Sequence, residues 1–273
     1  MFKASEESTT RGAKQVNQAL KFLVCGLEHS GTTMVSDLFR EQPETESGFE
    51  CGVLLCESPR EFLTFEPFCN HMEVGWGISK DDLVYACETD EFVHFYQRLF
   101  ERSSIVKTKQ PNYIFDKTPR YITHLQDVQS RLLLPTIAVL KDPRSLAVSD
   151  FKRTKRPMSE IEDWYKGWKI PKMNYMRSAY HGYQHAWSDS RCLVVRLEDI
   201  CFDAKKTVKS MYDFVGIEFK TEYLNLRHKR FGNTSGYSIS VGSCMDFMDI
   251  LPKKIQEMIV TDFAEFTDWF YSF

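Results

Sequence analysis

Short apolar runs alternate with longer amphipathic stretches along most of the chain. Residues 22–24 are all apolar, which predicts a buried strand, and a turn bracketed by Gly26 and Gly31 follows them. Apolar residues then recur at helical spacing, at Met34, Val35, Leu38 and Phe39. The first ordered stretch of the chain is therefore expected to be a strand, a tight turn and a helix.

The same patterns predict further strands and helices. Strands are expected at residues 49–55, 132–140 and 193–196, and another apolar run ends in a turn at residues 112–120. Helices are expected at residues 91–102, 144–155, 157–188, 205–215 and 252–269, with a break at Pro171. Residues 56–90 lack a clear period and are expected to be an irregular, partly buried insertion, and residues 231–242 a loop.

Strands that alternate with helices favour an α/β fold with a central, mainly parallel sheet flanked by helices on both faces. The chain has 273 residues, with no internal repeat and no linker, so we expect a single domain. Residues 1–18 are predicted to be a flexible N-terminal arm, and residues 19–273 to form the domain.

The turn between Gly26 and Gly31 predicts an anion site. A strand that turns directly into a helix leaves backbone N–H groups beside the positive end of the helix dipole. The spacing of the two glycines, with Thr33 after them, resembles a Walker A loop, but position 32 is Thr where that loop has Lys for the β- and γ-phosphates. We expect a three-layer P-loop-like fold that binds a less extended anion; a strand–turn–helix without a ligand stays open.

Composition narrows the class of protein. The net charge of −3 shows no basic excess, which argues against a generic nucleic-acid binder. The eight cysteines include no Cys-x-x-Cys pair and no metal-ligand spacing with His, so reduced thiols are expected. Residues 1–20 contain no apolar run, so neither a signal peptide nor a membrane anchor is expected, and the cytoplasm is the default location.

Three segments with cationic or hydroxyl side chains follow predicted strands, at residues 29–33, 116–120 and 141–144. Ligands of parallel sheets bind outside the carboxyl ends of the strands, so these segments should lie close together. Ser149 and Arg153 are four residues apart on the next helix, and with Lys141 they form a predicted second anion pocket. Two anion pockets suit a nucleotide with phosphates on both the 5′ and 3′ sides of its ribose.

With these residues in place, the chain resembles sulfotransferases that use 3′-phosphoadenosine 5′-phosphosulfate (PAPS). The loop that binds the 5′-phosphosulfate commonly begins with Arg or Lys, and it is matched by His29, Ser30, Gly31, Thr32 and Thr33. The 3′-phosphate motif commonly begins with Arg and ends with Ser eight residues later, and it is matched by Lys141 and Ser149. Residues 116–121 and 195–199 also resemble family segments, with Leu197 where Tyr is frequent.

The resemblance also implies catalytic residues. It is closest to the branch that includes tyrosylprotein and bacterial carbohydrate sulfotransferases. Lys117 would neutralise charge on the bridging oxygen of the leaving group, and Glu50, at the end of the second predicted strand, would be the general base. His29 is the alternative base, and the residues alone are equally compatible with Glu50 as an ordinary surface glutamate.

The predicted function is transfer of a sulfuryl group from PAPS to a hydroxyl of a carbohydrate or other small-molecule acceptor by in-line displacement. The aromatic-rich segments at residues 62–100 and 157–188 would bind that acceptor. Two alternatives stay open. A P-loop kinase would need Mg²⁺ and the missing Walker lysine, and a non-catalytic nucleotide- or anion-binding module would show no turnover.

Overall fold

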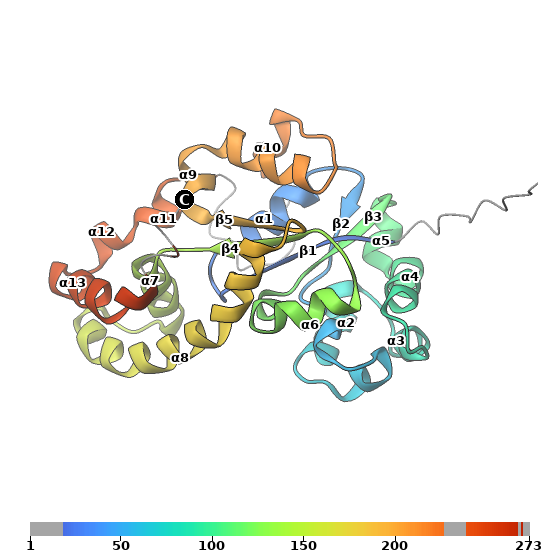
Figure 1. Ribbon diagram of the computed structural model, residues 1–273, viewed down its shortest axis with the longest axis horizontal. Helices are drawn as coiled ribbons and strands as arrows, with labels where there is room; N and C mark the ends of the chain where they lie inside the picture. Colours follow the sequence, from blue (N-terminus) through green and yellow to red (C-terminus); the bar gives the residue numbers. More distant parts are fainter. Residues whose placement is uncertain (1–18, 227–238, 267–268, 270–273) are drawn as a thin grey trace, which may run out of the picture.

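A five-stranded parallel sheet in the order β2-β3-β1-β4-β5 forms the centre of the molecule (Figure 1). The computed structural model describes residues 19–226, 239–266 and 269. The strands are β1 (Leu20–Gly26), β2 (Thr45–Glu46), β3 (Tyr113–Lys117), β4 (Thr136–Leu140) and β5 (Cys192–Arg196). The predicted α/β class with a mainly parallel sheet is confirmed.

Helices cover both faces of this sheet and complete three layers (Figure 1). One face is covered by α1 (Thr32–Arg40), α9 (Leu197–Phe202) and α10 (Ala204–Phe214). The other is covered by α4 (Phe92–Arg102), α6 (Leu125–Arg131), α7 (Pro143–Thr154) and α8 (Ile161–Ser188). The remaining α-helices are α2 (Phe68–Trp76), α3 (Lys80–Cys87), α5 (Ser104–Lys109), α11 (Gly242–Met245), α12 (Phe247–Ile250) and α13 (Lys253–Asp262).

The central strand β1 is buried on both faces because its side chains alternate between the two helix layers. Phe22 and Val24 pack into the core cluster beneath α1 and α10, whereas Leu23 and Cys25 pack into the cluster on the opposite face. A strand buried on both sides needs an unbroken apolar run rather than an alternating one, and residues 22–25 supply it.

The strand predicted at residues 49–55 is wrong. Sheet pairing stops at β2, and residues 53–55 form a 3₁₀ turn, η1 (Val53–Leu55). The N–H of Phe49 donates to the carbonyl of Gly75 at 2.9 Å instead of to a strand neighbour, and Gly52 has a left-handed φ of 74°. The apolar run therefore packs against α2 rather than extending the sheet.

The interpretation of residues 56–90 as an irregular insertion is also wrong. The segment contains a 3₁₀ helix, η2 (Pro59–Thr64), followed by α2 and α3. These elements are only six to nine residues long, too short for a periodic pattern to stand out in the sequence. Their buried side chains, Phe62, Phe68, Met72 and Trp76, nevertheless join the main core.

Two prolines lie at positions in the secondary structure that differ from the predicted ones. The predicted break at Pro171 is wrong, because α8 runs through it without interruption for 28 residues. Its exposed position explains this: the carbonyl left without a partner, that of Gly167, lies on an exposed turn where water can bond it. Pro135, in contrast, precedes β4, which starts one residue later because proline lacks the N–H that pairing needs.

The remaining connections are 3₁₀ turns: η3 (Pro119–His124), η4 (Met158–Glu160), η5 (Thr221–Leu224) and η6 (Ala264–Phe266). The predicted helix at residues 252–269 is shorter than expected, since α13 ends at Asp262. The predicted arm (residues 1–18) and most of the predicted loop at residues 231–242 lie outside the described residues. All eight cysteines are free thiols, as expected.

In the described part of the chain, no helix combines the length and apolar character that crossing a membrane requires.

Two glycines on α8 give a matched test of its packing. A Cβ at Gly182 would lie 1.7 Å from the carbonyl oxygen of Ile122 in η3, whereas a Cβ at Gly167 would meet nothing within 4 Å. We expect Gly182→Ala to lower the free energy of unfolding by about 1–3 kcal/mol, because the two backbones must separate. Gly167→Ala should leave it unchanged or raise it by up to about 1 kcal/mol through helix propensity. Urea denaturation measures both, and equal effects would contradict the packing.

Candidate active site

The turn after β1 depends on a close backbone approach at Gly26. This residue has φ 150°, and a Cβ there would lie 2.3 Å from the carbonyl oxygen of Val139 in β4. Only glycine allows the end of β1 to lie so close to its neighbour. The turn continues through His29 (φ 67°) and Gly31 (φ 103°), both in the left-handed region. For His29 this conformation is strained, a feature that is commonest at functional sites.

Backbone donors are left over where α1 begins. Gly31 occupies the N-cap position, so no side chain bonds to the first turn. Within the described residues, the N–H groups of Gly31, Thr32 and Thr33 have no hydrogen-bond partner, and the buried Ser30 hydroxyl has none either. Helix N–H groups in this position, together with the helix dipole, bind an anion readily.

A second cationic position lies just beyond β4. Lys141 is 4% exposed, and its Nζ donates a hydrogen bond of 2.7 Å to Ser149 Oγ on α7. Burial lowers the pKa of Lys141, whereas the negative charges of Asp246 and Glu198 raise it. The predicted neighbours Lys141 and Ser149 are therefore in direct contact, with the lysine charge held at a fixed position.

The two arginines near this position differ from each other. Arg153 is exposed on α7, and no hydrogen bond or ion pair joins it to Lys141 or Ser149 in the part of the chain described. Arg144, in the first turn of α7, is an ion-pair partner of Asp142 at 2.6 Å and lies 4.3 Å above the ring of Phe247. A helix face shared by two residues four apart therefore did not bring the Arg153 guanidinium to the lysine.

Lys117 and Glu50 form a pair at the end of β3. Lys117 Nζ donates to Glu50 Oε1 at 2.9 Å, and the side chains are 1% and 26% exposed. Burial lowers the pKa of Lys117, and the neighbouring Glu50 carboxylate raises it. Glu50 is four residues beyond β2 rather than at the end of a strand, so the predicted strand location was wrong although the two side chains meet.

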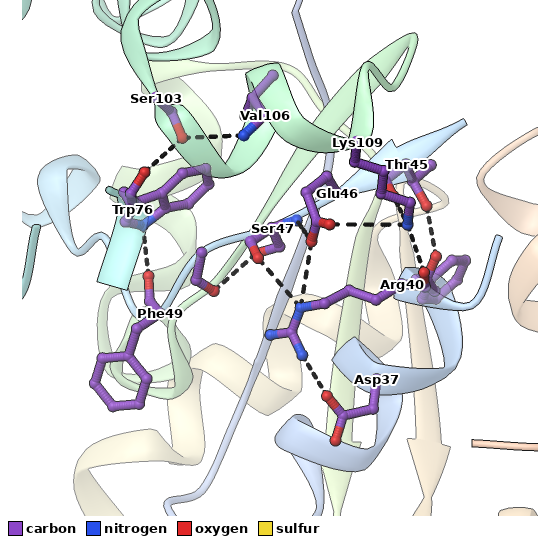
Figure 2. A network of polar contacts seen from close by, with 12 residues as sticks. Asp37, Arg40, Thr45, Glu46, Ser47, Phe49, Trp76, Ser103, Val106 and Lys109 are labelled. Carbon is purple, nitrogen blue, oxygen red and sulfur yellow. Dashed lines mark hydrogen bonds and ion pairs between the residues drawn. The ribbon is translucent and has the colours of Figure 1, made fainter. Parts of the chain in front are cut away.

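Backbone contacts on several sides fix the segment that carries Glu50 (Figure 2). The carbonyl of Ser47 accepts from Arg40 Nε at 3.2 Å, and the carbonyl of Phe49 accepts from Trp76 Nε1 at 2.5 Å. Farther along, the N–H of Gly52 donates to Thr118 Oγ1 at 3.1 Å. Glu50 therefore lies on an irregular segment with a well-defined position.

The hydroxyl of Thr118 makes no capping hydrogen bond to the 3₁₀ helix η3 (Pro119–His124) that follows it. It donates to Asp116 Oδ1 at 2.8 Å, and the other oxygen of this buried carboxylate accepts from Tyr96 and Tyr121 at 2.6 Å each. Burial raises the pKa of Asp116, and the three hydroxyl donors lower it. This network stabilises the end of β3 directly beside Lys117.

A buried charge cluster at the other end of α1 supports the Glu50 segment (Figure 2). Arg40 is an ion-pair partner of Asp37 and lies 3.6 Å from Glu46 Oε1, and all three side chains are at most 5% exposed. Lys109 Nζ lies 3.8 Å from Glu46 Oε2 and donates to the carbonyl of Thr45 at 2.7 Å. Two cations thus balance two carboxylates between α1, β2 and α5.

The sheet topology brings these groups to one edge. β1 lies between β3 and β4, with Val24 opposite Lys117 and Gly26 opposite Val139. The three segments with cationic or hydroxyl side chains, at residues 29–33, 116–120 and 141–144, were expected to lie at the carboxyl ends of the strands, on one edge of the sheet. This expectation is confirmed. Their roles in binding and catalysis stay predictions. Sequence reasoning missed Asp150, which bonds to His29 Nδ1, although it directly follows Ser149.

Comparison with known proteins assigns the family. Residues 22–221 match the family described as Sulfotransferase family, which is 200 of the 273 residues. The chain belongs to the sulfotransferase family, as its motifs predicted. No curated protein matches the chain.

Solved structures show the same fold. The sulfotransferase domain from the Synechococcus PCC 7002 olefin synthase has a TM-score of 0.61 at 16% identity, over 91% of this chain and 94% of that one. The sulfotransferase domain from the curacin biosynthetic pathway has a TM-score of 0.55 at 15% identity, over 90% and 97%. Mouse sulfotransferase SULT7A1, solved in complex with PAP, has a TM-score of 0.51 at 11% identity, over 91% and 86%.

Arg40 offers a test of the charge cluster. Arg40→Met leaves the Asp37 and Glu46 carboxylates buried beside one cation fewer, so we expect the free energy of unfolding to fall by about 3–5 kcal/mol. The matched control is Arg60→Met, which removes an exposed pair with Asp90 and should change stability by less than about 1 kcal/mol. Equal losses in urea denaturation would show that the cluster does not hold this region.

Proposed function

We propose that this sulfotransferase moves a sulfuryl group from PAPS to a hydroxyl of a carbohydrate or other small-molecule acceptor. The observation that carries this proposal is that two sets of hydrogen-bond donors, those of residues 30–33 and those of Lys141 and Ser149, lie on one sheet edge. The Lys117–Glu50 pair lies at the same edge. The mouse relative solved with PAP supports the choice of nucleotide.

The groups present fit such a nucleotide. The free N–H groups of residues 31–33 and the orphan hydroxyl of Ser30 would hold its 5′ end, with the hydroxyls of Thr32 and Thr33 assisting. Lys141 and Ser149 would hold the 3′-phosphate, and the exposed Arg153, four residues beyond Ser149 on α7, is a further candidate ligand. A buried hydroxyl and three N–H groups that have no partner among residues 19–226, 239–266 and 269 are donors that an anion would satisfy.

PAPS, when bound, supplies the sulfuryl group and leaves as 3′-phosphoadenosine 5′-phosphate. The Lys117 side chain is held at the end of β3, where it would neutralise negative charge on the bridging oxygen of the leaving group. Glu50 takes the proton of the acceptor hydroxyl as that oxygen bonds to sulfur. Its Oε1 is bonded to Lys117, and Oε2 has no partner among the described residues, so Oε2 is the oxygen for this step.

Family membership favours sulfuryl transfer over the kinase alternative, which lacks the Walker lysine at position 32. The acceptor proposal rests on the aromatic side chains of residues 62–100 and 157–188 that are exposed, which are Tyr85, Tyr180 and Trp187. Others in these segments, such as Phe62, Trp76 and Tyr165, are buried in the core and are not available to an acceptor. The eight free cysteines are typical of a reducing compartment and support a cytoplasmic location.

Glu50 and Lys117 have separate expected effects on turnover. We expect Glu50→Gln to lower kcat by about 10²–10⁴-fold because the base is lost, and Lys117→Met to lower it by about 10²–10³-fold. The dissociation constant for the desulfated nucleotide should change little in the first variant. Glu57→Gln, at an exposed glutamate, is the control. Labelled PAPS with a panel of alcohols measures these rates. Full activity in Glu50→Gln together with its loss in His29→Gln would make His29 the base.

Lys141 should discriminate between nucleotides. We expect Lys141→Met to weaken binding of 3′-phosphoadenosine 5′-phosphate by about 10–100-fold and to leave 5′-AMP binding unchanged, because only the former has a 3′-phosphate. Arg153→Met measures any contribution of the exposed arginine, and Lys209→Met on α10 is the control. Calorimetry measures the dissociation constants of both nucleotides. If Lys141→Met weakens the binding of both equally, Lys141 does not contact the 3′-phosphate.

A further inference from the structure

Asp150 joins three elements around the anion loop. Its Oδ1 is hydrogen-bonded to His29 Nδ1 in the turn after β1, and its Oδ2 accepts from Trp168 Nε1 at 2.7 Å and from Lys172 Nζ at 3.0 Å, both on α8. Asp150 itself lies on α7, directly after Ser149. One carboxylate therefore contacts the loop proposed for the 5′ end and adjoins the residue proposed for the 3′-phosphate.

The contact determines which way the His29 ring presents its nitrogens. Since a carboxylate accepts, Nδ1 carries the proton, and Nε2 is the nitrogen left for a ligand. No hydrogen bond engages Nε2 in the described ranges, and the side chain is 31% exposed. The flanking backbone is held as well: Glu28 N–H donates to Tyr175 at 3.2 Å, and Ser30 N–H donates to the carbonyl of Leu27 at 3.1 Å.

The charges explain why a carboxylate here does not cancel the imidazolium. Lys172 is 7% exposed and already balances Asp150, so a proton on His29 gives the three side chains a net positive charge. Burial raises the pKa of Asp150, but the contacts with His29 and Lys172 bring it down to about 2, so the carboxylate is ionised at neutral pH. Among the described residues, Lys141 interacts electrostatically with Asp150, and Glu28, Arg120 and Glu50 interact with Tyr175, whose hydroxyl contacts the loop.

The loop itself contains one side chain that can be positively charged, His29. Between Leu27 and Thr33 the charged or titratable residues are Glu28 and His29 alone. A site for the sulfated or phosphorylated end of a nucleotide gains from a cation, and histidine supplies one only when its surroundings favour the proton. A guanidinium would be charged whatever its surroundings, whereas the contribution of this imidazole depends on the orientation that its contact with Asp150 fixes.

We propose that Asp150 is a positioning residue that holds His29 as the loop's cation, with Nε2–H directed to the 5′ end of the nucleotide, while Lys172 neutralises the carboxylate. The proposal rests on the proposed function, because it assigns a nucleotide 5′-phosphate to this loop. Asp150 then acts through His29 and touches neither substrate.

A double-mutant cycle tests this role. The readout is the ratio of the dissociation constants of adenosine 3′-monophosphate and 3′-phosphoadenosine 5′-phosphate, which isolates the 5′-phosphate. We expect Asp150→Asn and His29→Gln each to lower this ratio by about tenfold, which equals a loss of about 1.4 kcal/mol. The double variant should lose no more than either single one, because Asp150 acts only through His29. Asp163→Asn, at an exposed carboxylate of α8, is the control.

Each outcome has a separate meaning. If Asp150→Asn does not fold, Asp150→Asn/Lys172→Met removes the two buried charges together, and the same ratio is measured in it. Additive losses, or an unchanged ratio in Asp150→Asn, would mean that Asp150 only joins α7 to α8, and would overturn this proposal alone. If the unmodified protein binds both nucleotides equally, no 5′-phosphate site exists and the proposed function fails with it.

Discussion

The close approach of Gly26 to the carbonyl of Val139 is the constraint on which the site depends. It allows β1 to end beside β4 and turn at once into α1, so the helix begins at the edge of the sheet. A side chain at this position would separate the two backbones and move the whole first turn of α1. The donors at residues 30–33, the Lys141–Ser149 contact and the Lys117–Glu50 pair share one edge because β1 lies between β3 and β4.

Helix α1 links the two halves of the proposed chemistry. Its N-terminus offers N–H groups that no described residue accepts from, and Arg40 at its other end donates to the carbonyl of Ser47, three residues before Glu50. The nine residues between these ends form a rod of about 14 Å, at about 1.5 Å per residue. The position of the proposed base relative to the proposed donor loop is thus set by one rigid element and a buried charge cluster.

Local patterns in the sequence predicted much of this molecule. The strand–turn–helix at Gly26 and Gly31, the helix after β4 and the sheet class all depend on short-range spacing, and the structure has them. The choice of Lys117 and Glu50 as candidate catalytic residues came from family resemblance. Their direct contact was not predicted, since the two residues are 67 positions apart. Asp150 and the Arg40 cluster left no signal in spacing, because contacts between distant segments follow from the tertiary packing. The strand predicted at residues 49–55 is absent because an apolar run can pack against a helix as well as in a sheet.

The most direct test is a crystal structure of the protein with 3′-phosphoadenosine 5′-phosphate. The 5′-phosphate should accept from the N–H groups of Gly31, Thr32 and Thr33, and the 3′-phosphate should contact Lys141 Nζ and Ser149 Oγ. A nucleotide bound elsewhere, or one whose 3′-phosphate points into solvent away from Lys141, would contradict the claim that two separate sites bind the sulfuryl donor.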